Sequence, residues 1–208
     1  MKKNCTEVVF ILDRSGSMCG LEKDTIGGFN SLINKQKKQD GEVLVSTVLF
    51  NDSSVVIHDR KPIDEVRLMT NKDYEVYGCT ALLDALGSSI RHIGNIHKYA
   101  RIEDVPEHTM FVIITDGMEN ASRYYSKERV KLMIEYEKEK YGWEFLFLAA
   151  NAIDTASQYG IDKDHAVNYQ CDSVGTRLNY EVLDEAIQCI CSGVPLSKSW
   201  KSKIEKRK

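Results

Sequence analysis

The sequence predicts a doubly wound α/β domain, in which a mostly parallel six-stranded sheet carries helices on both faces. Short continuous apolar runs such as 8–12 and 111–115 are typical of strands buried on both faces of a parallel sheet. Helical patterns alternate with these runs, which indicates right-handed crossovers. One tight turn, Asn51-Asp52-Ser53, joins two of the strands, so that pair must be antiparallel.

In the first part of the chain, the apolar run from Val8 to Leu12 is the first strand. Apolar residues at helical spacing then predict a helix from Leu21 to about Asp40, and Gly41 is expected to end it as a C-cap. Val43 to Phe50 and Ser54 to His58 form the antiparallel pair of strands.

A polar loop with about one turn of helix follows over 62–77. An apolar stripe then predicts a helix from Ala81 to Tyr99, with Thr80 as its N-cap. The remaining predicted elements are a strand at Phe111–Thr115, a helix capped by Ser126 and ending near Tyr141, a strand at Phe145–Ala150, a short helix capped by Asp154 and ending near Tyr159, a strand at Ala166–Tyr169, and an amphipathic helix at 172–191.

Length and composition favour one globular domain, predicted over 1–194, followed by a basic tail over 195–208 that we expect to be a solvated terminus. The 28 basic and 31 acidic residues give a net charge of -3, which favours neither nucleic acid nor an anionic membrane as a partner. No apolar stretch suits a signal peptide or a membrane span, so a cytoplasmic location is expected. The six cysteines lack zinc-ligand spacing and are expected to be reduced thiols.

Hydroxyl and carboxylate side chains follow two of the predicted strands. Asp13, Ser15 and Ser17 come directly after the first strand, Thr80 opens a later helix, and Asp116 follows the strand at 111–115. If the two strands are parallel neighbours, their carboxyl ends meet at one crevice. Two carboxylates and three hydroxyls without nitrogen or sulfur suit a hard cation, with Mg²⁺ favoured, then Mn²⁺, and Ca²⁺ as a further option.

The Asp-x-Ser-x-Ser pattern of 13–17, Thr80 after Gly78-Cys79, and Thr115-Asp116-Gly117 together resemble the metal-ion-dependent adhesion site of von Willebrand factor A domains. The resemblance extends from about Glu7 to about Ser192, and it is to the stand-alone intracellular prokaryotic type. It implies a strand order of 3-2-1-4-5-6 with strand 3 antiparallel at the edge. It also implies that the three hydroxyls donate oxygens to the ion, and that the two acids coordinate it directly or through water.

The resemblance implies a non-enzymatic module that binds a Glu or Asp of a partner protein through the cation. The face around the ion is expected to contact the partner through Arg14, Met18, Cys79, Met118, Arg123 and Tyr124. Several of these residues also have a plainer interpretation. The two arginines could be ordinary surface charges, Tyr124 and its neighbour Tyr125 could pack on the following helix, and each proposed metal ligand taken singly could be a turn or cap residue.

Two alternative functions use the same residues. A hydrolase or phosphatase could employ the ion as a Lewis acid, but no histidine lies near the motif in the sequence to act as a general base. A redox-responsive binder could use Cys19 and Cys79, each within two residues of a proposed ligand. The binding module is the preferred prediction.

Overall fold

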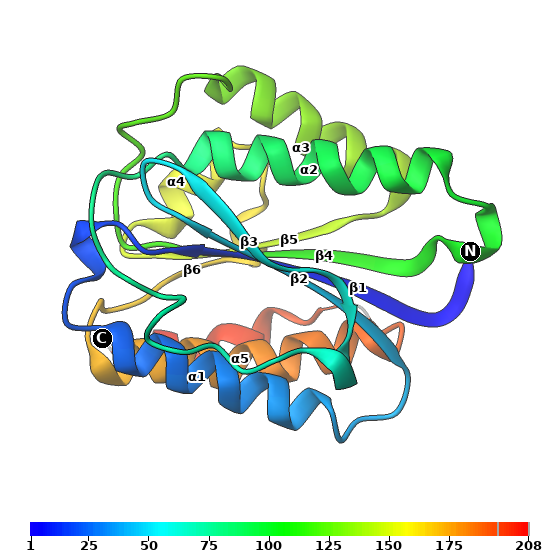
Figure 1. The fold of residues 1–208 in the computed structure, drawn as a ribbon, viewed down its shortest axis with the longest axis horizontal. Helices are drawn as coiled ribbons and strands as arrows, with labels where there is room; N and C mark the ends of the chain where they lie inside the picture. Colours follow the sequence, from blue (N-terminus) through cyan, green and yellow to red (C-terminus); the bar gives the residue numbers. More distant parts are fainter. Residues whose placement is uncertain (195, 208) are drawn as a thin grey trace.

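The computed structural model describes residues 1–194 and 196–207, and its sheet lies between two layers of helices (Figure 1). The strand order is β3-β2-β1-β4-β5-β6. β2 and β3 pair antiparallel, and the other neighbouring strands of this sheet pair parallel. The predicted topology, with an antiparallel third strand at the edge, is confirmed. The strands are β1 Lys2–Asp13, β2 Glu42–Phe50, β3 Ser54–Pro62, β4 Pro106–Ile114, β5 Glu144–Ala149 and β6 Ala166–Asn168.

Helices α2, α3 and α4 cover one face of the sheet, and α1 and α5 cover the other (Figure 1). The helices are α1 Glu22–Gln36, α2 Leu82–Tyr99, α3 Lys127–Tyr141, α4 Ala152–Gln158, α5 Ser173–Cys191 and α6 Ser202–Glu205. Short 3-10 turns occur at η1 Gly16–Met18, η2 Ile63–Glu65, η3 Ile102–Asp104, η4 Lys163–His165 and η5 Lys198–Lys201.

The central position of β1 in the sheet explains why the apolar run near its end is unbroken. Successive side chains of a strand point to opposite faces. Phe10 and Leu12 therefore join the core beneath α1 and α5, while Val9 and Ile11 join the core beneath α2, α3 and α4. Because both faces are covered by helices, every position in this part of the strand is buried.

The observed boundaries extend β1 and β4 beyond their apolar runs. β1 starts at Lys2, which pairs with Pro106 at the start of β4. Helix α1 ends at Gln36, earlier than predicted, so Gly41 is not its C-cap. Gly41 instead has a φ of +107° directly before β2, a conformation that glycine adopts without strain.

One of the three predicted N-caps, Ser126, is present, and Asp172 forms a further cap that was not predicted. The Ser126 hydroxyl accepts a hydrogen bond from the backbone N–H of Arg129, and the Asp172 carboxylate caps α5 in the same way. Helix α2 begins after Ala81, so the prediction that Thr80 caps it was wrong. Helix α4 starts at Ala152, which places Asp154 inside its first turn and not at the cap.

The basic tail folds back onto the domain. Trp200 and Ile204 are buried in the core on the α1 and α5 side, and the Lys201 ammonium donates to the carbonyls of Lys163 and Ala166. Arg207 forms a two-pronged ion pair with Asp172. The expectation of a solvated terminus was therefore wrong for this stretch, although positions 195 and 208 of the predicted tail lie outside the described residues. The boundary predicted at residue 194 stays a prediction.

In the part of the chain that the structure describes, no helix combines the length and the apolar character needed to cross a membrane.

Candidate metal centre

The site forms where β1 and β4 end side by side. Asp13 is the last residue of β1, and Ser15 and Ser17 lie in the turn that follows. The register pairs Leu12 with Ile114, so the segment that carries Asp116 leaves the sheet at the same edge. The crossover connection between parallel strands thus brings residues about a hundred positions apart in the sequence to one crevice.

Hydrogen bonds connect the three hydroxyls and Asp116 in a row. The Thr80 Oγ1 donates to the Ser15 Oγ at 3.0 Å, and the Ser15 and Ser17 Oγ atoms are 3.0 Å apart. The Ser17 Oγ in turn donates to the Asp116 Oδ1 at 2.5 Å. All four side chains therefore point into the crevice, although three separate loops supply them.

Asp13 lies at the back of the crevice and is buried. Its Oδ1 accepts the Ser15 backbone N–H at 2.7 Å, and its Oδ2 accepts the Thr115 hydroxyl at 2.5 Å. These bonds fix the carboxylate in one orientation. Thr115 was not among the predicted site residues, yet it connects the end of β4 to the end of β1.

Gly117 lies directly against these side chains. A methyl group on its Cα would lie 2.7 Å from the Thr80 Oγ1, 3.1 Å from the Ser17 Oγ and 3.5 Å from the Asp13 Oδ2. Oxygens from two segments of the chain thus lie so close to Gly117 that a side chain there would displace them. Hard oxygen ligands of this kind fit a small divalent cation.

The charges of the site also fit a cation. Burial raises the pKa of Asp13, and the nearby Asp116 charge raises it further, while hydrogen bonds from Thr115 and Ser15 act in the opposite direction. Within residues 1–194 and 196–207, no lysine or arginine forms an ion pair with either acid. The same residues contain no group of three or more His, Cys, Asp and Glu side chains that could hold a metal. Any ion here would therefore depend on the hydroxyl oxygens together with the two acids.

The segment between β3 and α2 supports the site from the β1 side. The Tyr74 hydroxyl donates to the Asp13 carbonyl, the Tyr77 N–H donates to the Arg14 carbonyl, and the Gly16 N–H donates to the Gly78 carbonyl. Gly78 has a φ of +77°, and a side chain there would collide with Asp52. These backbone contacts bring Thr80 to the serines.

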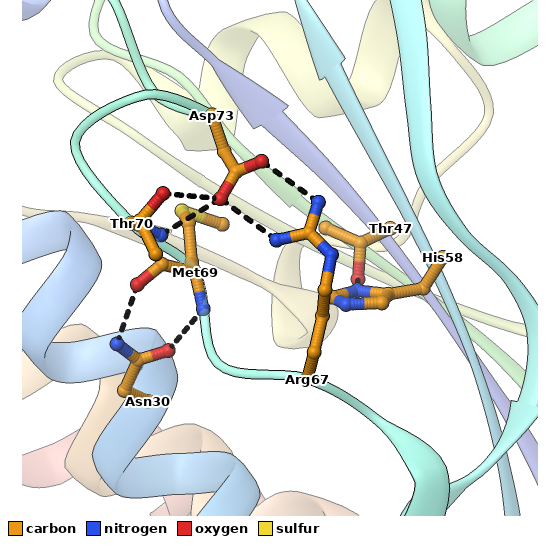
Figure 2. A network of polar contacts seen from close by, with 7 residues as sticks. All are labelled: Asn30, Thr47, His58, Arg67, Met69, Thr70 and Asp73. Carbon is orange, nitrogen blue, oxygen red and sulfur yellow. Dashed lines mark hydrogen bonds and ion pairs between the residues drawn. The ribbon is translucent and has the colours of Figure 1, made fainter.

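Figure 2 shows how the same segment is fastened to the rest of the domain. The Asn30 side chain on α1 exchanges two hydrogen bonds with the Met69 backbone, at 2.8 and 2.9 Å. Asp73 accepts two hydrogen bonds from the Arg67 guanidinium and two from Thr70. We call residues 66–80, held by these contacts, the supporting segment.

The loop between β4 and α3, residues 115–126, is fastened to the start of α2. The carboxylate of Asp84 accepts the three successive backbone N–H groups of 123–125. In return, Glu119 and Ser122 accept the free N–H groups of Leu83 and Asp84 at the helix start. Sequence reasoning missed this reciprocal arrangement, although an acid in the first turn of a helix was a visible signal.

Asn120 was also missed, and it connects the two halves of the site. Its side-chain oxygen accepts the Thr80 N–H at 2.9 Å, and its own N–H donates to the Thr80 carbonyl at 3.0 Å. Thr80 is therefore fixed by the loop that carries Asp116.

The predicted partner-binding residues divide into two groups. Cys79, Met118, Arg123 and Tyr124 are exposed. Met18 is buried, so its assignment to the partner-binding face was wrong. Arg14 is also buried, and its guanidinium lies 5.4 Å from the Tyr77 ring centre.

Two further expectations concern side chains near this face. Tyr125 packs against Gly87 of α2 and lies under the guanidinium of Arg129, as the plainer interpretation predicted, whereas Tyr124 is exposed. Cys19 and Cys79 are both exposed free thiols in this structure.

Comparison with known proteins identifies the fold. No protein-family model and no curated protein matches the sequence. Among solved structures, the von Willebrand factor domain of the type V pili tip protein Mfa5 from Porphyromonas gingivalis matches with a TM-score of 0.65 at 10% identity, covering 92% of this chain and 97% of that one.

Two longer proteins match as well. The PilB minor pilin from Streptococcus sanguinis has a TM-score of 0.59 at 13% identity, covering 88% of this chain and 61% of PilB. The von Willebrand factor type A protein from Catenulispora acidiphila has a TM-score of 0.58 at 12% identity, covering 89% of this chain and 42% of its own. The chain thus spans less than two thirds of either protein. At such identities the matches show that the chain has a von Willebrand factor A-like fold.

Proposed function

We propose that this chain is a non-enzymatic protein-binding module that holds a divalent cation between Asp13, Ser15, Ser17, Thr80 and Asp116. The observation that carries the proposal is the convergence of these five side chains, which are joined by hydrogen bonds at one edge of the sheet. Mg²⁺ is the first choice because it accepts a mixture of oxygens and waters, with Mn²⁺ second and Ca²⁺ third.

The residues have separate roles in this proposal. Asp13 is held rigidly by Thr115 and Ser15, so it supplies a fixed charge at the back of the crevice. Ser15, Ser17 and Thr80 add neutral oxygens, which leave part of an ion's charge uncompensated. When bound, the ion would supply an electrophilic position for a Glu or Asp carboxylate of a partner protein. Cys79, Met118, Arg123 and Tyr124 surround that position as exposed contact residues.

The histidines support a binding role over a hydrolytic one. His58 contacts Thr47, His97 contacts Glu7, and His165 contacts Glu144. These three histidines therefore have structural partners outside the crevice, which disfavours them as general bases for the Lewis-acid alternative. A cytoplasmic location also stays a prediction from the sequence.

The test compares metal binding by the wild-type chain and by Asp116→Ala, using calorimetry with Mg²⁺ and then with Mn²⁺. We expect the wild-type chain to bind and the variant to lose binding by about 100-fold or more, because a charged oxygen leaves the site. Asp154→Ala is the matched control, since Asp154 lies in the first turn of α4 without a capping bond. Circular dichroism of all three proteins checks that the fold is kept.

A second measurement addresses the partner. Affinity capture from the native lysate is expected to retain a protein in Mg²⁺ and to release it in EDTA or with Asp116→Ala. Equal capture in EDTA would rule out the metal-bridged mode of binding.

A further inference from the structure

A cavity of about 330 Å³ opens directly beside the candidate metal centre, between the β4–α3 loop and helix α4. Asp116 and Gly117 belong both to the metal centre and to the cavity wall, so the two are continuous. We call this space the side cavity. The side cavity is also lined by seven further residues that matter below: Leu82, Met118, Lys127, Phe147, Thr155, Gln158 and Tyr159.

The inner wall of the side cavity is apolar. Leu82 from α2, Phe147 from β5 and Tyr159 after α4 are core residues whose edges face this space. An apolar cavity of about 150 Å³ is large enough for benzene. The side cavity is larger, so one aliphatic or aromatic side chain from outside fits it.

The rim of the side cavity carries a positive charge. Lys127 is the cation among the lining residues, and its ammonium donates to the Gln158 side-chain oxygen at 2.6 Å. Among the described residues, no carboxylate forms an ion pair with Lys127. The Glu119 carboxylate also lines the side cavity and accepts backbone N–H groups of Leu83, Ala121 and Ser122. A second negative charge on an occupant would be attracted to Lys127 and repelled by Glu119, so it would lie near Lys127.

We infer that the side cavity selects the partner by the residues that flank its acidic residue. The partner segment is acidic and extended: one carboxylate faces the metal centre, a neighbouring apolar side chain fills the side cavity, and a further acidic residue lies near Lys127. Met118, which is 86% exposed at the rim, supplies an adaptable apolar contact over the inserted side chain. This inference rests on the proposed function, because it extends the same binding face.

The experiment uses twelve-residue peptides displayed on phage, with a fixed central Glu and random flanks, selected on the full chain in Mg²⁺. Thr155→Trp fills the side cavity, since Thr155 lines it from α4. Ser157→Trp is the matched control, because Ser157 is an exposed residue of the same helix outside the cavity wall. Lys127→Ala tests the rim charge. Calorimetry with Mg²⁺ alone checks that each variant keeps its metal centre.

For the wild-type chain and Ser157→Trp, we expect Leu, Ile, Met or Phe to be enriched about tenfold at one flanking position, as burial of such a side chain predicts. Thr155→Trp should lose that enrichment while it still selects acidic peptides in Mg²⁺. Lys127→Ala should lose only the preference for the second acid.

Four results would overturn the inference. Mg²⁺-dependent selection of acidic peptides without any apolar preference would do so and leave the proposed function standing. The inference would also be overturned, with the proposed function left standing, if Thr155→Trp keeps the apolar preference. The same result follows if Ser157→Trp loses that preference as much as Thr155→Trp does. If no peptide binds in a Mg²⁺-dependent manner, the proposed function fails and the inference fails with it.

Discussion

The two sides of the candidate metal centre are held in different ways. On the β1 side, Asp13 and Ser15 are each 1% exposed, and the supporting segment connects them to α1 and to the core. On the β4 side, the Asp116 side chain accepts a hydrogen bond from Ser17, and the next non-glycine residue, Met118, is exposed. That loop is fixed farther along, where Asp84 and Glu119 join it to α2.

This difference indicates that the two sides of the site have different roles. The β1 side is a preformed frame, because burial and several hydrogen bonds determine the position of each oxygen. The β4 side presents exposed side chains on a loop whose ends are anchored, so its surface residues are free to differ without cost to the core. Substitutions on the two sides should therefore affect metal affinity, stability and pH dependence differently.

The largest expected effect is on Mg²⁺ affinity. It comes from Gly117, which lies on the β4 side but has side chains of the β1 side closely packed against it. Gly117→Ala places a methyl group among the oxygens of Thr80, Ser17 and Asp13, so Mg²⁺ affinity should fall by about 100-fold, as measured by calorimetry. Gly27→Ala is the control, because a methyl group on Gly27 in α1 meets no atom within 4 Å. Unchanged affinity in Gly117→Ala would show that the ion, if it binds, lies elsewhere.

The second effect is on the free energy of unfolding, and it tests the preformed frame on the β1 side. Asn30→Ala removes both hydrogen bonds to the buried Met69 backbone and should lower the free energy of unfolding by about 2 kcal/mol. Amide hydrogen exchange should become faster across the supporting segment. Asn95→Ala, at an exposed position of α2, is the control for the change in helix propensity. Equal unfolding free energies for the two variants would mean that the supporting segment does not depend on this clamp.

The smallest effect is a pH dependence within the frame. The Arg67 guanidinium beside Asp73 holds the pKa of that carboxyl well below its usual value, with help from Thr70 and against the effect of burial. A depressed pKa in the folded state means that the stabilisation is fully present above the unfolded-state pKa of about 3.9 and is lost as the pH falls below it.

Urea unfolding of the wild-type chain and Asp73→Asn checks this prediction. The difference in unfolding free energy should be about 1.5 kcal/mol at pH 7 and should shrink steadily below pH 4. Asp40→Asn, at an exposed position, is expected to show no such trend. A difference that stays constant from pH 7 to pH 3 would contradict the assigned role of the Arg67 contact.

The sequence predicted the elements whose signal is local. Apolar runs and helical stripes record burial at each position, so the order of strands and helices followed from them, and the tight turn after β2 identified the antiparallel edge. The five oxygen-bearing side chains were also found, because each stands directly beside a predicted element. Whether they bind a cation stays a prediction, although the fold brings them together.

Only the tertiary structure decided what depends on partners distant in the sequence. Thr80 looks like a helix cap in isolation, but its hydroxyl contacts Ser15 and its backbone is held by Asn120. Met18 looks like an exposed loop residue, yet the turn after β1 directs it into the core. The basic tail looks solvated, but Trp200 finds an apolar surface there. Local periodicity reports whether a residue is buried, whereas the direction of a loop side chain and the partner of a polar group are set by packing between segments that meet only in the folded chain.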